Sequence, residues 1–284
     1  MNATAIAPSL WRCTLLLVGK ELADARRNRW FLLYAVTFTV LAVGLCWLSV
    51  SGLAHVGHAS LGRTAGSLVS LVLLVVPLMG LSLGAQAIAA ERERGALLYL
   101  LAQPIGVREV VAAKFVGLAT AIVGALLFAF GVAATTLSGQ ATSGLTAFLG
   151  FLGLSLLLAT ATVSIGLFLS ALASRSSVAT GLALFVWLAM VFGGDLGLMG
   201  TALVLRLDTA TLLAASLVNP LQVFKIAAVL VLQGGLEALG PAGAYASARW
   251  GEALGPALAG LLALWTIVPL LGAGWLLRRR GALP

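Results

Sequence analysis

Six long apolar segments, with almost no charged side chains inside them, constrain this sequence more than any other feature. A helix needs about 20 apolar residues to cross a lipid bilayer, and each of the six is long enough. The segments cover residues 30–50, 66–88, 115–137, 145–172, 178–198 and 256–277. The sequence therefore predicts an all-α polytopic membrane protein, with six transmembrane helices in a single transmembrane domain over residues 1–284.

The composition excludes a water-soluble globular protein. Of the 284 residues, 61% are hydrophobic and only 9% are charged, whereas a soluble domain carries about 25% charged residues. The net charge of +8 would favour nucleic-acid binding in a soluble protein. Here the basic residues lie at the ends of apolar segments and form no patch interleaved with aromatic residues. We therefore expect contact with membrane lipid and no binding of nucleic acid.

The basic residues also predict the orientation of the spans. With six spans and a cytoplasmic N-terminus, most of the 17 basic residues fall on the cytoplasmic side, as the positive-inside rule requires. A seventh apolar stretch, 212–232, contains the helix-breaking Asn219-Pro220 and places Lys225 at mid-membrane. Counting it as a span would also move the final arginine triplet outside. We therefore predict a multi-pass protein of the bacterial inner membrane with both termini in the cytoplasm.

Two further segments are partly apolar but are not predicted to span the membrane. Residues 9–29 form an amphipathic pattern, which predicts a helix lying in the inner membrane interface. Residues 211–251 form an external hydrophobic excursion between spans five and six, which we interpret as re-entrant or surface helices. This excursion can serve as a lid or exit gate, or simply as a packed outer cap.

The stretch 91–104, between spans two and three, is the most informative part of the sequence. It opens with four alternating charges and a glycine, continues as a short leucine-rich helix and ends at Pro104, because the residue before a proline is disfavoured in helices. Leu97, Leu100 and Leu101 share one stripe of this helix. A short helix with an exposed apolar side suits docking into a groove on another protein. The predicted contact residues are Glu91, Arg92, Glu93, Arg94, Gly95, Leu97, Leu98, Leu100, Leu101, Gln103 and Pro104.

This stretch resembles the hallmark loop of the permeases of the ABC-2 transporter family, in which a coupling helix docks on the nucleotide-binding subunit. The family also has six spans, an interfacial N-terminal helix and short external helices between spans five and six. The resemblance implies the membrane-spanning subunit of an ATP-driven transporter, with ATP and Mg held by a separate cytoplasmic ABC ATPase. One departure is Gly95-Ala96, where the family loop usually has Gly-Thr, so one hydroxyl that can cap the helix is lost.

A narrower resemblance covers most of the chain and concerns the permeases of nitrous oxide reductase maturation transporters. It is carried by Lys20-Glu21-Leu22, Arg27-Asn28-Arg29-Trp30, Ala42-Val43-Gly44, Asp195 within 192–196, and Asn219-Pro220. It implies export of a sulfur- or copper-related species for copper-site assembly in the periplasm, with a periplasmic β-helix protein as a further partner. The alternatives are an ABC-2 exporter of a drug, lipid or ion, and a secondary transporter or membrane scaffold without an ATPase.

The sequence shows no catalytic chemistry of its own. It lacks the G-x-x-x-x-G-K-[ST] motif that cradles phosphates, so we expect neither an enzyme nor a cofactor in this chain. His55 and His58, three residues apart, are the one candidate metal pair. They can ligate copper if they share a helix face, but solvated loop histidines are the more common interpretation.

The remaining candidate site lies near the outer membrane surface. Asp195 is a carboxylate at the outer end of span five, and intramembrane carboxylates are costly and often functional. Together with Asn219 and Pro220 it forms the predicted gate or pathway region, although a tilted span would bring Asp195 into the outer interface instead. Because six spans supply only half the wall of a pathway, we also expect a homodimer.

Overall fold

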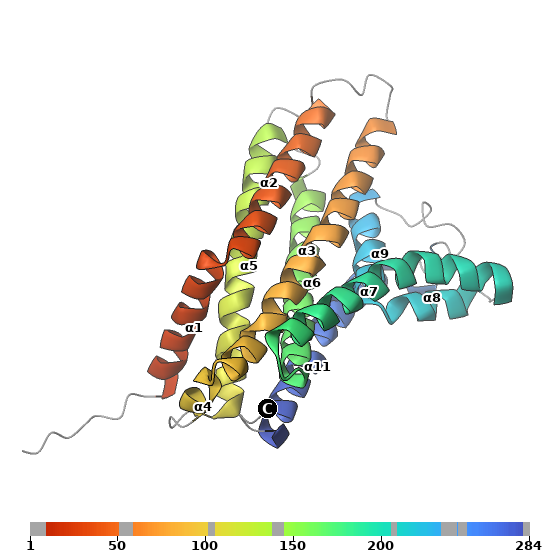
Figure 1. Ribbon diagram of the computed structural model, residues 1–284. Helices are drawn as coiled ribbons and strands as arrows, with labels where there is room; N and C mark the ends of the chain where they lie inside the picture. Colours follow the sequence, from red (N-terminus) through yellow and green to blue (C-terminus); the bar gives the residue numbers. More distant parts are fainter. Residues whose placement is uncertain are drawn as a thin grey trace, which may run out of the picture.

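The computed structural model describes residues 10–50, 59–101, 106–137, 145–205, 209–233, 243 and 249–280. Over these residues the chain forms helices and no strand (Figure 1). The elements are α1 (Leu10–Arg27), α2 (Arg29–Val50), α3 (Ala59–Glu93), α4 (Ala96–Leu101), α5 (Val107–Leu137), α6 (Leu145–Leu172), α7 (Ser176–Leu205), α8 (Thr209–Leu217), α9 (Pro220–Gln233), η3 (Gly251–Ala253) and α11 (Leu254–Arg280). The predicted all-α class is confirmed.

Six of the described helices are long and apolar enough to cross a membrane, as predicted. They contain the stretches Arg29–Leu48, Gly66–Glu93, Val107–Thr136, Leu145–Leu172, Ser176–Asp195 and Gly251–Arg279. The seventh apolar stretch is a bent pair, in which Ala210–Leu217 and Pro220–Leu232 meet at 112°. That bend is the geometry of a broken span or a re-entrant loop, and it follows from the break at Asn219-Pro220.

The centre of the bundle is the contact between α3 and α6, where the two backbones nearly touch. A Cβ atom added at Gly84 would lie 2.6 Å from the Val163 carbonyl oxygen, and one added at Gly166 would lie 2.7 Å from the Leu81 carbonyl oxygen. One turn further on, the Ser170 hydroxyl accepts hydrogen bonds from the Ile88 and Ala89 amides at 3.0 and 2.8 Å. Small residues are what permit such an approach between membrane helices.

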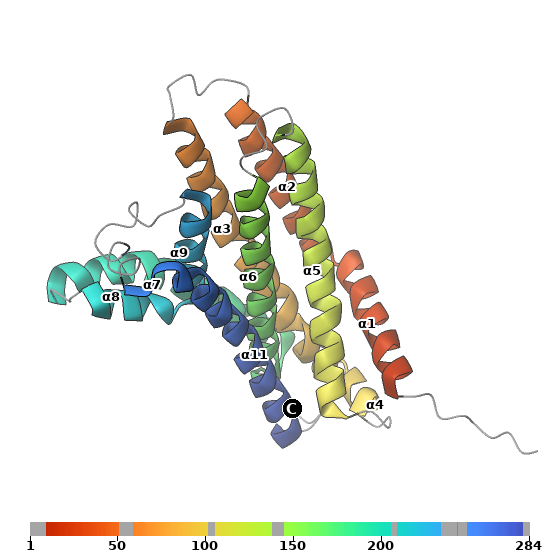
Figure 2. The same cartoon turned by 180° about the vertical axis from the view of Figure 1, so that it is seen from behind.

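The other helices surround this central pair on two sides. Helices α2 and α5 pack on one side, while α9 and α11 pack on the other (Figures 1 and 2). Helix α7 contacts α3 near its own start and then runs outward from the bundle. Most of its apolar face, including Phe185 and Phe192, is therefore left uncovered by this chain.

Helix α1, predicted to lie in the membrane interface, runs lengthwise along the N-terminal half of α5 (Figures 1 and 2). The contact is close because α5 has a glycine there. A Cβ atom added at Gly117 would lie 2.6 Å from the Glu21 Cβ and 3.1 Å from the Val18 carbonyl oxygen. Asn28 separates α1 from α2, and its side-chain oxygen accepts a hydrogen bond from the Trp30 amide at 3.0 Å.

Replacing Gly84 with alanine is expected to destabilise the protein, because the new methyl group would lie less than 3 Å from three backbone atoms of α6. Overpacking of this kind costs about 1–3 kcal/mol. The measurement is the thermal unfolding midpoint of the purified permease in detergent. Gly153→Ala on α6 is the matched control, because a Cβ atom there has no neighbour within 4 Å. Equal midpoints for the two variants would contradict the α3–α6 packing described above.

Candidate functional site

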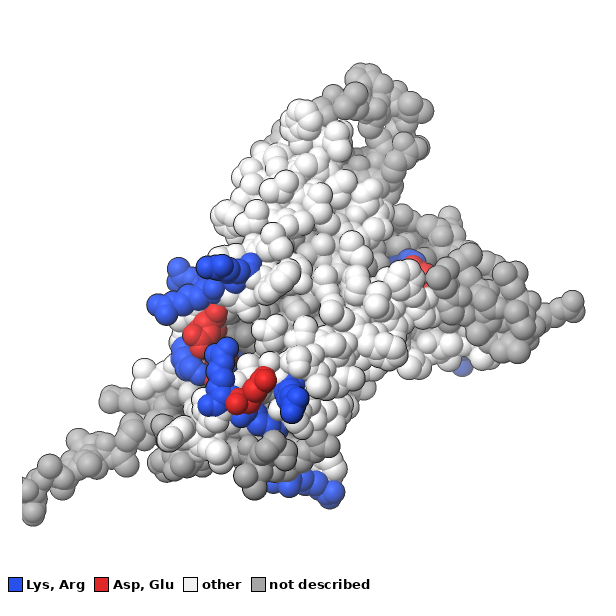
Figure 3. All heavy atoms as spheres, in the orientation of Figure 1, with Lys and Arg blue, Asp and Glu red and all other residues white. Residues whose placement is uncertain are grey.

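The C-terminal end of α3 holds three consecutive charged residues, and each of them bonds to a different part of the molecule. Glu91 reaches α1 and α5, Arg92 reaches the end of α6, and Glu93 reaches the start of α7. On the face seen in Figure 3, charged side chains gather at the end of the molecule that contains α1 and α4. Among the described residues on that face, only a few other charged side chains are seen, near α7 and at the lower right edge.

Glu91 belongs to a cluster of four charged residues, which we call the charge cluster: Lys20, Glu21, Glu91 and Lys114. The Lys114 ammonium group lies 2.7 Å from Glu21 Oε1 and 2.7 Å from Glu91 Oε2, while Lys20 donates to Glu91 Oε1 at 2.6 Å. The side chains of Lys114 and Glu21 are only 3% and 8% exposed. Removing one partner from such a buried pair costs about 3–5 kcal/mol, because the other charge stays buried.

Lys20 is the most exposed member of the charge cluster. Burial alone would lower the pKa of its ammonium group, but the hydrogen bond to Glu91 and the charges of Glu91, Glu21 and Asp24 outweigh burial. The pKa of Lys20 therefore lies above its ordinary value, so Lys20 stays charged at physiological pH.

Arg92 and Glu93 bind the two helix ends that flank the short loop between α6 and α7. The buried Arg92 guanidinium donates to the carbonyl oxygens of Ala173 at 2.6 Å and Ala171 at 3.4 Å. Glu93 Oε2 accepts from the amide and the hydroxyl of Ser176 at 3.0 and 2.5 Å. A cation at a helix C-terminus and an anion at a helix N-terminus satisfy orphan backbone groups and complement the helix dipoles.

In the stretch 91–104, the first three charged residues belong to α3, which continues through Glu93. The chain then turns at Arg94 and Gly95, and α4 begins at Ala96. Gly95 has φ = +74°, a left-handed conformation that costs a residue with a side chain about 1–2 kcal/mol. Residues 102–105, which include Gln103 and Pro104, and the side chain of Leu101 lie outside the part that the structure describes.

Two of the predicted contact residues are buried within this chain. Arg92 binds the end of α6, and Leu97 is fully buried against the bundle, so neither is available to a partner protein. The exposed side chains of α4 are instead Leu98, at 52%, and Tyr99, at 80%. A helix of six residues has too few turns for its sequence pattern to reveal which face packs inward, so only the tertiary structure distinguishes Leu98 and Tyr99 from Leu97.

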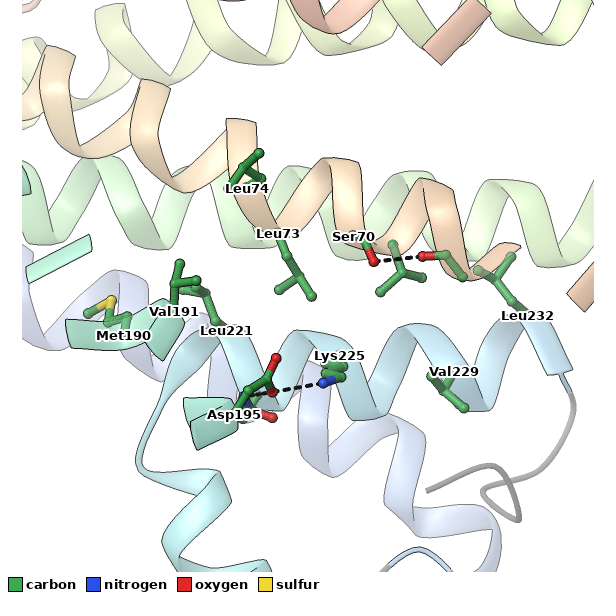
Figure 4. A pocket seen from close by; sticks show the side chains of 13 residues that line it. Ser70, Leu73, Leu74, Met190, Val191, Asp195, Leu221, Lys225, Val229 and Leu232 are labelled. Atoms are coloured by element: carbon green, nitrogen blue, oxygen red, sulfur yellow. Dashed lines mark hydrogen bonds and ion pairs between the residues drawn. The ribbon is translucent and has the colours of Figure 1, made fainter. Parts of the chain in front are cut away.

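A second candidate site lies between α3, α7 and α9 and has a volume of about 330 Å³ (Figure 4). We call it the outer pocket because the topology predicted from the sequence places it on the external side. Its walls are mostly apolar, with Leu73, Val191 and Val229 among them. At one side Asp195 Oδ1 lies 2.8 Å from the Lys225 ammonium group and accepts a hydrogen bond from Gln222 at 2.8 Å. The predicted gate residue Asp195 on α7 is thereby joined to α9, and its carboxylate is more than half exposed.

Asn219 fixes the bend between α8 and α9. Its side-chain nitrogen donates to the Met190 carbonyl oxygen of α7 at 2.6 Å, and its side-chain oxygen accepts from the Leu221 amide at 3.0 Å. Pro220 follows at the first position of α9, where the missing amide hydrogen costs nothing. Asn219 and Pro220 thus hold α9 at the position from which Lys225 reaches Asp195.

The candidate metal pair cannot be placed, because His55 and His58 lie outside the described residues. Within the described ranges no three His, Cys, Asp or Glu side chains come together in a group that can hold a metal ion. Neither the charge cluster nor the outer pocket contains a histidine or a cysteine.

Comparison with known proteins identifies the family. Residues 15–282 match the model of the ABC-2 family transporter protein. This chain belongs to the ABC-2 transporter family. It is 34% identical over 280 residues to a Pseudomonas aeruginosa protein described as a probable ABC transporter permease protein NosY, with 96% of this chain and 99% of that protein covered. A Stutzerimonas stutzeri protein with the same description is 33% identical over 231 residues, covering 79% of this chain and 84% of that protein.

Membership in the ABC-2 family confirms the resemblance on which the loop 91–104 was interpreted. The chain is the permease subunit of an ABC transporter, and such permeases work with an ATPase partner and are generally not catalytic themselves. Within this framework α4 and the charged end of α3 lie in the loop between the second and third spans, where the coupling helix was expected.

Arg92→Met is expected to lower stability by about 1.5–3 kcal/mol, which is the range for a hydrogen bond made by a charged group. The loss arises because the terminal carbonyl groups of α6 lose their donor. The measurement is the unfolding midpoint in detergent. Arg94→Met is the matched control, since Arg94 is exposed in the neighbouring turn. A midpoint for Arg92→Met equal to that of Arg94→Met would show that Arg92 does not support the α6 end.

Proposed function

We propose that this permease forms a homodimer with two cytoplasmic ATPase subunits, and that each ATPase docks on α4. The observation that carries the proposal is the exposed pair Leu98 and Tyr99 at the end of the second span. The turn at Gly95 holds α4 against α3, and the buried Leu97 anchors it. Two exposed apolar side chains on an anchored helix suit a groove in a partner protein.

The proposed cargo is a sulfur- or copper-related species exported for copper-site maturation of periplasmic nitrous oxide reductase. The support is the similarity, over nearly the whole chain, to proteins described as NosY permeases. In this arrangement the permease lies in the bacterial inner membrane with both termini in the cytoplasm, and a periplasmic β-helix protein receives or accompanies the cargo. An ABC-2 exporter of a drug, lipid or ion is the alternative that a transport assay would reveal.

We assign the outer pocket to the exit side of this pathway. The pocket is lined by residues 66–74 in the first half of α3, whereas α4 follows the C-terminal end of that helix, and α9 of the bent pair forms another wall. The ion pair between Asp195 and Lys225 closes one side of it and ties α9 to α7. Because both side chains are partly exposed, the pair contributes only about 0–1 kcal/mol. A contact of that strength can open and close during a transport cycle.

Replacing Leu98 and Tyr99 together with aspartate should release the ATPase during detergent purification, while the permease still inserts. Burial of each apolar side chain is worth about 1.5–3 kcal/mol, so the double variant should weaken binding at least a hundredfold. The measurement is the ATPase-to-permease ratio after affinity purification. Tyr99→Phe, which keeps the ring, should retain the wild-type ratio. If the double variant also retains it, the ATPase does not dock on α4.

Asp195→Asn should alter transport without changing the yield or stability of the complex. The substitution removes the charge that binds Lys225 but keeps an oxygen that can accept from Gln222. The measurement is the copper content of periplasmic nitrous oxide reductase in cells. It is made together with the yield of the purified permease–ATPase complex. Glu252→Gln, a change to an exposed carboxylate before α11, serves as the control. If the enzyme in Asp195→Asn cells contains as much copper as in wild-type cells, Asp195 has no role in the exit pathway and is only an interface residue.

A further inference from the structure

We propose that the charge cluster transmits the movement of the ATPase from α4 to α1 and α5, with Glu91 and Lys114 as its positioning residues. Glu91 was predicted from the sequence to touch the ATPase, but its carboxylate is directed toward helices of its own chain. The inference rests on the proposed docking of the ATPase on α4, and its test separates the two.

The chain path from α4 to the charge cluster is short and rigid. Only Arg94 and Gly95 lie between the end of α3 and the start of α4, and the fully buried Leu97 keeps α4 on the bundle. Glu91 sits in the last turn of α3, three residues before Arg94. A force applied to the exposed face of α4 therefore reaches the Glu91 carboxylate without passing through a flexible segment.

Beyond Glu91 the force passes to two other helices through Lys114. This ammonium group lies on α5 and binds Glu91 on α3 and Glu21 on α1, both at 2.7 Å. The lysine is almost completely buried, so neither carboxylate can exchange it for water without leaving a charge uncompensated. The close approach of α1 at Gly117 fits this arrangement, since any side chain there would push Glu21 away from Lys114. Helices α1, α3 and α5 are thus tied at one point.

Lys20 is the one member of the charge cluster that can exchange one carboxylate partner for another. It is half exposed, and its ammonium group lies 2.6 Å from Glu91, 3.7 Å from Glu21 and 3.9 Å from Asp24. When α3 shifts, Lys20 can move between these carboxylates at little cost while Lys114 keeps its two partners. The cluster therefore tolerates displacement of α1 along α3 without separating.

The two residues after Glu91 connect α3 to two further helices, α6 and α7. Arg92 holds the C-terminal carbonyl groups of α6, and Glu93 holds the first amide of α7. Consecutive residues thereby connect α4 to α1 and α5 on one side and to α6 and α7 on the other. Since α7 carries Asp195 into the outer pocket, the charged end of α3 has a continuous connection to the far end of the molecule.

The test uses the complete complex of permease and ATPase in lipid nanodiscs, in a Cys13→Ser, Cys46→Ala background. Gly66→Cys is the reporter, because Gly66 lines the outer pocket and has open space around it. Its labelling rate with a membrane-impermeant maleimide is measured with and without ATP and vanadate. We expect the nucleotide to change this rate at least fivefold with the intact cluster and less than twofold with Glu91→Gln or Lys114→Met.

Both cluster variants should retain the ATPase at the wild-type ratio and should still hydrolyse ATP. Glu252→Gln, a change to an exposed carboxylate outside the charge cluster, is the control and should respond as the wild type does. Lys114→Arg keeps the charge and should restore most of the response even if Lys114→Met folds poorly. This rescue distinguishes a transmitting role from a merely structural one.

Two results would overturn the proposal. A wild-type labelling response in Glu91→Gln would show that the movement bypasses the charge cluster. Loss of the ATPase from Glu91→Gln would show that Glu91 is a docking residue after all. Failure of the Leu98 and Tyr99 variant to release the ATPase would instead disprove docking on α4, and the reporter response of the cluster variants would still decide whether the cluster transmits movement.

Discussion

The contact between the backbones of α3 and α6 is the interaction on which the rest of this structure depends. Lipid covers apolar side chains as well as protein does, so membrane helices associate through close packing and hydrogen bonds rather than through the hydrophobic effect. Gly84 and Gly166 supply the packing, and the Ser170 hydroxyl supplies hydrogen bonds one turn further on. This contact fixes the end of α3 beside the loop between α6 and α7, and only there can Arg92 and Glu93 find their partners.

The charged end of α3 shows how a membrane protein pairs the ionised groups that it buries, here Arg92, Lys114 and Glu21. Buried ion pairs add little to stability compared with apolar packing, because desolvation offsets most of their attraction. They do fix which groups lie together, since any other arrangement leaves a buried charge without a partner. At this end of the molecule that requirement brings α1, α3 and α5 to Lys114, and it brings the end of α6 to Arg92. The exposed Glu93 adds a hydrogen-bonded contact with the start of α7.

Two helices connect the charged end of α3, beside α4, with the outer pocket. Helix α3 contributes Ser70 and Leu73 to the pocket and ends at the charged residues beside α4. Helix α7 begins at Ser176, which binds Glu93, and reaches the pocket at Asp195. Under the proposed function such a link is needed, because the ATPase would dock at one end of the molecule and the cargo would leave at the other.

The sequence by itself determined the features that depend on local composition. The six spans follow from the length of each apolar segment, because transfer into lipid is decided segment by segment. The bend between α8 and α9 follows from Asn219-Pro220, and the place of the predicted coupling loop follows from its charges and leucines. Only the tertiary structure decided which of those charges face inward. The partners of Glu91 lie on α1 and α5, far away in the chain, and Leu97 and Leu98 are neighbours with opposite exposure. Burial and pairing depend on which helices are adjacent, and that adjacency is set by glycine contacts that no local pattern reveals.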